Sequence, residues 1–207
     1  MRTILYIAGA ALAAIVAFVV YRYIKVIAQS IKQDQIRADR IRPLVNLFDS
    51  GHDVRREDVL PFAEGLLTRE ATYKLLKEKG RLDLFPEHLM SVESAAAGNL
   101  ANWLEFPTEL ASCPDEMEHV GRYTFQHDGR DYHYHVFRYR VNEPHWAAPN
   151  GWMLGAAGPY FDDSEPYDFP SGTFSRCSST EETTDAESEA RWIHENIGLR
   201  THPKRPV

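Results

Sequence analysis

Cysteine is scarce in this sequence: only Cys113 and Cys177 occur among its 207 residues. Small domains that depend on disulfides for stability carry several cysteine pairs, so that class of protein is excluded. The acidic residues that follow Cys113 disfavour the thiolate that a catalytic cysteine needs. We therefore expect two reduced thiols without a catalytic role.

The motifs of several enzyme and binding classes are missing as well. The chain has no Gly-x-Ser-x-Gly elbow, no His-Glu-x-x-His helix, no calcium-binding loop and no glycine-rich loop for phosphate. No internal repeat is present, which argues against repeat architectures. These absences favour a protein that has no cofactor and no catalytic activity of its own.

Basic residues are too few to balance the acidic ones, and they are unevenly placed. The whole chain has a net charge of −7. Residues 1–42 contain seven Lys and Arg against two Asp, a net charge of +5, so residues 43–207 carry −12. An acidic domain of this kind repels phosphate backbones, which argues against nucleic acid as a partner. The charge favours a partner protein with a basic surface.

A single long hydrophobic run stands at the start of the chain. Residues 3–20 contain no charged side chain, and Tyr21-Arg22-Tyr23 follows them. Eighteen helical residues span about 27 Å, close to the ~30 Å hydrocarbon core of a bilayer. A cleaved signal peptide would have a shorter apolar core followed by small residues. We predict a single uncleaved transmembrane helix at 3–20, after a flank of residues 1–2.

The charges beside this run predict how it is oriented. Before the run stand only Arg2 and the terminal amine, whereas five basic residues follow it: Arg22, Lys25, Lys32, Arg37 and Arg40. Cytoplasmic flanks carry the excess of Lys and Arg. The sequence therefore predicts a single-pass protein of the cell membrane whose soluble domain lies in the cytoplasm.

Small residues recur every four positions in the predicted anchor, at Gly9, Ala13 and Ala17. Such spacing lets two helix backbones approach closely, which favours a weak homodimer through the anchor. Alanine is frequent throughout this span, so the spacing can also arise by chance.

Residues 21–42 contain no Pro or Gly, and Pro43 is expected to end a helix that leaves the membrane. Ile24, Ile27 and Ile31 follow a 3-4 spacing that Asp34 interrupts. Two interpretations remain open for this juxtamembrane helix. It forms a short coiled coil, or it is an amphipathic helix that lies on its own domain or on lipid headgroups.

The remaining segment, 43–199, is predicted to be an acidic α+β domain followed by a disordered tail at 200–207. We expect three helices, at 53–65 with Asp53 as cap, at 68–80 with Gly80 at the end, and at 92–105. The third helix should bury one face, made of Ala96, Leu100, Trp103 and Leu104.

A small antiparallel sheet should follow these helices. Residues 120–125 and 132–141 are rich in aromatic and β-branched side chains, and the Asp128-Gly129 pair between them is a hairpin signal. Residues 152–157 predict a third short strand that Pro159 ends. From 159 to 179 we expect an aperiodic loop whose five aromatic residues are packed down. A closing helix then runs from 184 to Gly198.

Histidines gather around the predicted hairpin. His133 and His135 lie on one face of a strand, about 6.6 Å apart along it, and can offer two imidazoles to one metal. A third ligand would come from one of these residues: His119, Asp131, His145, Asp162 or Asp163. The other interpretation is a half-buried sheet surface whose histidines form hydrogen bonds.

The opposite face of the same strand carries Tyr132, Tyr134, Val136, Arg138 and Arg140. These residues can bind an anionic group, or they can form a solvated face whose arginines pair with the many acids of the domain. The second interpretation suits the charge of −12 better.

Two functions follow from these patterns. The first is a membrane-anchored protein-interaction module that is not an enzyme. The alternative is a membrane-tethered, metal-dependent hydrolase that uses His133 and His135.

Overall fold

The computed structural model describes residues 2–104, 117–140, 151–162, 165–168, 174–178 and 186–201. For residues 2–17, several later positions of the first helix, and 174–178, the backbone alone is described. The fold is α+β, as predicted, with helices first, an antiparallel sheet next and a closing helix last.

The first helix, α1 (Arg2–Asp49), is 48 residues long and passes through Pro43 without a break. The prediction that Pro43 ends the helix is therefore wrong. Leu44 is fully buried, and Val45, Leu47 and Phe48 pack on the same cluster of apolar side chains. Burying an aliphatic or aromatic side chain contributes about 1.5–3 kcal/mol, so this turn outweighs the roughly 3 kcal/mol that an internal proline costs. The folded domain thus begins inside α1.

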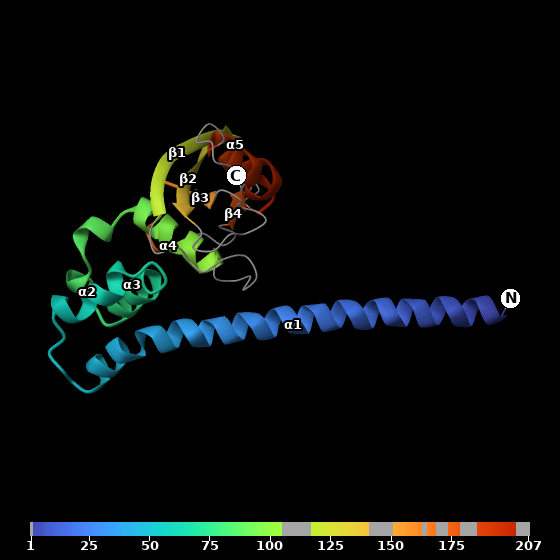
Figure 1. Cartoon of the computed structure of the whole chain (residues 1–207), viewed down its shortest axis with the longest axis horizontal. Coiled ribbons are helices and arrows are strands. Elements are labelled where there is room, and N and C mark those ends of the chain that lie inside the picture. Colours follow the sequence, from blue (N-terminus) through green and yellow to red (C-terminus); the bar gives the residue numbers. More distant parts are fainter. Residues whose placement is uncertain are drawn as a thin grey trace.

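Most of α1 extends away from the rest of the molecule. Its N-terminal half reaches beyond every other element (Figure 1). Ile24 and Ile31 are 59% and 54% exposed, so this stretch does not lie against its own domain. Contact with the domain is made nearer the other end, where Arg37 Nη2 donates to the Asn102 carbonyl at 3.1 Å.

Within the part of the chain whose side chains are described, no helix is both long and apolar enough to cross a membrane. The span predicted at 3–20 falls almost wholly outside that part. Only Phe18 and Val20 of those residues have described side chains, and both are exposed.

Two short helices, α2 (Arg56–Glu64) and α3 (Arg69–Glu78), pack against the end of α1. Arg55, and not the predicted Asp53, is the N-cap residue of α2, and the carboxylate of Asp58 in the first turn accepts its N–H at 2.9 Å. Gly80 ends α3 as predicted: its φ is +68°, and the next N–H donates to the Leu76 carbonyl at 2.8 Å.

Two single turns of 3₁₀ helix, Leu82–Leu84 and Glu87–Leu89, lead to α4 (Val92–Leu104). Ala96, Leu100 and Leu104 are buried against the sheet, as predicted. Trp103 is 37% exposed and does not share that buried face. Helix α4 lies between α3 and the sheet, and the side chains in its middle are mainly small. The large indole of Trp103 stands in the last turn of α4.

The sheet has four antiparallel strands in the order β1-β2-β3-β4. Strands β1 (Met117–His127) and β2 (Arg130–Arg140) form the predicted hairpin, with positive φ values at Asp128 and Gly129. Their register shifts between His119 and Gly121, which marks a bulge at Val120.

Two predictions about the rest of the sheet are wrong. Strand β3 (Trp152–Tyr160) does not end at Pro159. The register of β2 and β3 shifts between His133 and His135, and such an irregular position tolerates a residue without an N–H group. A fourth strand, β4 (Phe174–Ser178), occupies part of the segment predicted as a loop. It pairs with β3, and its sequence lacks the alternation that would reveal it.

The expected packing of the aromatic residues in that segment is confirmed where they are described. Tyr160 and Phe161 are buried. Tyr167 stacks on Tyr73 with ring centroids 4.6 Å apart, and its hydroxyl donates to the Leu89 carbonyl at 2.9 Å.

Helices cover both faces of the sheet (Figure 1). Helix α4 packs on Phe137 and Tyr139, whereas α5 (Ala186–Ile193) packs on Tyr132, Tyr134 and Val136. The second face was predicted to be solvated, but those three side chains are at most 3% exposed. Antiparallel sheets often have one face in contact with solvent. In this protein the closing helix α5 covers that face.

The chain continues from α5 through a π-helical turn, His194–Gly198, into α6 (Leu199–Thr201). Gly198 is therefore not the predicted helix end. It allows a close approach instead, since a Cβ there would lie 2.2 Å from the Tyr134 hydroxyl oxygen. The predicted start of the helix at 184 and most of the predicted tail lie outside the described residues.

Candidate functional site

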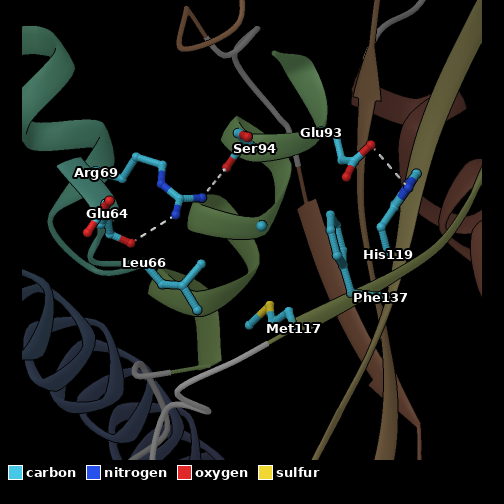
Figure 2. A pocket seen from close by; sticks show the side chains of 9 residues that line it. Glu64, Leu66, Arg69, Glu93, Ser94, Met117, His119 and Phe137 are labelled. Atoms are coloured by element: carbon cyan, nitrogen blue, oxygen red, sulfur yellow. Dashed lines mark hydrogen bonds and ion pairs between the residues drawn. The ribbon is translucent and has the colours of Figure 1, made fainter. Parts of the chain in front are cut away.

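A pocket of about 370 Å³ lies where the helical part of the domain meets the sheet (Figure 2). The segment around α2 and α3 contributes Glu64, Leu66 and Arg69, and strands β1 and β2 contribute the Met117, His119 and Phe137 side chains. Helix α4 forms the wall between them with Glu93, Ser94 and Ala97.

Arg69 joins three helices at one side of this pocket. Its guanidinium donates to the carbonyls of Ala63 at 3.0 Å, Glu64 at 2.9 Å and Ser94 at 3.2 Å. The first two carbonyls belong to the last turn of α2, where helix carbonyls lack intrahelical partners. Burial lowers the pKa of Arg69, but an arginine keeps its charge. The guanidinium is therefore directed at the backbone.

The other side of the pocket holds a chain of three polar side chains. Glu93 Oε2 lies 3.2 Å from His119 Nδ1, and His119 Nε2 lies 3.1 Å from His135 Nδ1. Exposure falls along this chain: 53% for the Glu93 side chain, 23% for that of His119 and 6% for His135. Figure 2 shows the Glu93 carboxylate meeting the His119 ring beside Phe137.

Burial keeps the imidazole of His135 neutral at pH 7. Burial lowers its pKa to about 4, and the neighbouring His119 adds to the effect. Because a carboxylate only accepts, His119 Nδ1 carries the proton that faces Glu93, and His119 Nε2 and His135 Nδ1 share one proton between them. Both nitrogens of His119 are therefore engaged.

His133 has different partners from His135. Its Nδ1 lies 2.9 Å from Thr124 Oγ1, and its Nε2 lies 3.0 Å from Asp162 Oδ1. Asp162 also accepts from Arg122 Nη2 at 2.9 Å. His133 first, and then Arg122, lower the pKa of Asp162.

The predicted metal ligands are thus divided between two sets of contacts. His119 meets His135, Asp162 meets His133, and Asp131 lies opposite Gln126 near the hairpin turn. His145 and Asp163 lie outside the described residues. Across the described parts of the chain, no group of three or more His, Cys, Asp or Glu is arranged to hold a metal ion. A metal centre at His133 and His135 stays a prediction.

Arg138 of β2 pairs with an acidic residue, as the charge pattern predicts. Arg138 pairs with Glu118 of the neighbouring strand, with Nε 3.2 Å from the carboxylate, and its guanidinium lies 4.7 Å from the Trp152 ring centroid. The alternative of an anion-binding face would need this arginine for its ligand. Cys113 lies outside the described residues, and the Cys177 side chain in β4 is not described, so their redox state stays a prediction.

Sequence reasoning missed the pocket itself. Glu64, Arg69 and Glu93 come from three different helical segments, and no spacing in the sequence links them to His119. Only His119 was singled out, as one possible metal ligand among several.

Comparisons with protein-family models, with curated proteins and with solved structures found no match to this chain. A function is therefore inferred from the charge distribution, the shape of the molecule and this pocket.

Proposed function

We propose that this protein is a single-pass membrane protein whose acidic α+β domain binds a basic surface of another protein, without catalysis. The observation that carries the proposal is the charge distribution: +5 in residues 1–42 against −12 in residues 43–207. Potentials of this size attract and orient a partner of opposite charge.

The ion pairs of the domain support an excess of carboxylates that a partner can bind. Lysines of α3 and the turn after it are paired: Lys74 with Glu70 at 2.6 Å and Lys79 with Asp49 at 3.1 Å. Arg122 is paired with Asp162. Acidic residues outnumber basic ones by twelve after residue 42. Even if every basic side chain is paired, carboxylates therefore remain for a partner. Exposed pairs of this kind contribute little to stability, so a partner can replace them.

The shape of α1 supports a membrane anchor. About 72 Å of continuous helix, at 1.5 Å per residue, carries the hydrophobic run 3–20 away from the folded domain (Figure 1). Tyr21 and Tyr23 are 63% and 68% exposed just after that run, where amphipathic rings suit the membrane interface. In this arrangement the domain stays clear of the bilayer, on the side of the cytoplasm.

The pocket supports binding better than catalysis. A histidine that acts as a general base needs a ring nitrogen that can reach a substrate proton, whereas each nitrogen of His119 faces Glu93 or His135. The Arg69 guanidinium is likewise directed at three backbone carbonyls.

The experiment is site-directed crosslinking of the full chain in its native membrane. A photoreactive residue is placed at Glu64, near the pocket, and for comparison at Arg200, after the closing helix. A partner captured from Glu64 is then purified and mixed with the full chain in detergent. We expect direct binding that weakens by about an order of magnitude when salt rises from 50 to 200 mM. Salt-independent binding, or a captured partner without a basic surface, would contradict the proposal.

A further inference from the structure

We propose that the pocket between α2, α4 and β1 receives one cationic side chain, a lysine or an arginine, from the basic partner. This inference rests on the proposed function and adds the place and the chemistry of the central contact.

The hydrogen-bond donors and acceptors around the pocket are unequally occupied. Three of the five N–H groups of Arg69 donate to backbone carbonyls, and both ring nitrogens of His119 face other side chains. The acceptors are less occupied. Glu93 contacts His119 through Oε2, and Glu64 is exposed, with a charge that raises the pKa of Arg69. A ligand that donates hydrogen bonds to these carboxylates is therefore complementary to the pocket.

The Glu93 side chain is 53% exposed while His119, behind it, is 23% exposed, so the carboxylate stands at the mouth. Figure 2 shows Glu93 on the side of the sheet and Arg69 across the pocket from it. An entering cation therefore meets Glu93 before it meets the buried guanidinium of Arg69.

Part of the pocket lining is apolar. Leu66 and Met117 are partly exposed and offer apolar surface, and the buried Phe137 and Ala97 also line the pocket. The methylene stem of a lysine or arginine packs on such surfaces while its charged head stays with a carboxylate. A volume of about 370 Å³ is close to the lower end of ligand pockets, roughly 300–1,000 Å³, which suits one side chain.

Other occupants are less compatible with this lining. An anion would face the Glu93 and Glu64 carboxylates, with the Arg69 guanidinium turned to the backbone. A neutral apolar group would remove water from Glu93 without replacing its hydrogen bonds, which is costly for a charged group.

The experiment measures binding of a small probe to the full chain in detergent micelles. The probe is Nα-acetyl-lysine methylamide, and its control is Nα-acetyl-norleucine methylamide, which lacks the ammonium group. The readout is the methyl NMR signal of ¹³C-labelled Met117, assigned with Met117→Leu. We expect a saturable shift with the lysine compound in the millimolar range and none with the norleucine compound.

Two variants test the site. Glu93→Gln keeps the shape and should weaken binding at least about tenfold. Ala97→Val keeps every charge but narrows the pocket, and should also weaken binding. Glu87→Gln removes an exposed charge of α4's preceding turn and should change binding less than about twofold. Unchanged signals from the hairpin show that each variant is folded.

A second probe separates failure of the pocket from failure of the proposed function. A 20-residue polylysine should bind the wild-type chain in a salt-dependent way. If it binds Glu93→Gln equally well and the lysine compound shifts nothing, the pocket is not the site although acidic recognition stands. If neither probe binds the wild type, both proposals are overturned. Equal shifts with the lysine and norleucine compounds would also overturn the pocket proposal.

Discussion

At the scale of single residues, His135 is a buried base whose protonation opposes folding. Its ring is 6% exposed, and its pKa in the folded protein is lowered to about 4 by burial. An unfolded histidine has a pKa of about 6.5. Between these two values the unfolded chain binds a proton that the folded chain does not, so stability falls as the pH falls through this window.

The His135→Asn variant should therefore depend less on pH than the wild type. Between pH 7 and pH 5 the wild type should lose on the order of 2 kcal/mol through His135. The variant should lose less, although His194 still contributes, because burial lowers its pKa too. Urea unfolding of the full chain in detergent, followed by tryptophan fluorescence, measures the difference. Identical pH dependence of the two proteins would contradict the assignment.

Gly155 is a residue-scale test of the packing between α4 and the sheet. A Cβ at this position would lie 2.7 Å from Leu100 Cδ2 and 3.2 Å from Tyr139 Cε1. Overpacking of a buried site costs about 1–3 kcal/mol, so Gly155→Ala should lower the melting temperature clearly. Gly121→Ala is the matched control, because its nearest neighbour would be an ordinary contact at 3.4 Å. Equal effects of the two substitutions would argue against this close approach.

At the scale of elements, Arg69 connects α2, α3 and α4 through three backbone carbonyls. Arg69→Met should destabilise the fold by about 3 kcal/mol or more, since hydrogen bonds to a charged group contribute about 1.5–3 kcal/mol each. The control is Arg81→Met, which removes an exposed pair with Asp83 and should cost less than about 1 kcal/mol. Urea midpoints of both variants provide the comparison. Similar losses of stability would show that the hydrogen bonds of Arg69 do not hold the three helices together.

At the scale of the whole molecule, the charges of α1 predict on which side of a membrane the domain lies. The excess of Lys and Arg after residue 20 predicts a cytoplasmic domain. A reporter that is active only in the cytoplasm, fused after Val207, should be active. Activity only from a reporter that must be exported would reverse the orientation and would make a Cys113–Cys177 disulfide plausible.

Local sequence was sufficient wherever a short pattern decides the structure by itself. The Asp128-Gly129 turn and the Gly80 helix end were both predicted correctly. Each depends on backbone preferences or on side-chain spacing within about ten residues. The transmembrane span is a prediction of the same kind, because it needs only a run of apolar residues.

Tertiary structure decided the features that depend on distant partners. Pro43 stays inside α1 because its next turn is buried, and β4 forms because β3 offers it a pairing edge. The face of Tyr132 and Tyr134 was predicted to be solvated, but it is buried because α5, more than fifty residues later in the chain, covers it. The pocket follows the same rule: Arg69, Glu93 and His119 come together only when three segments pack, and no local pattern encodes that contact.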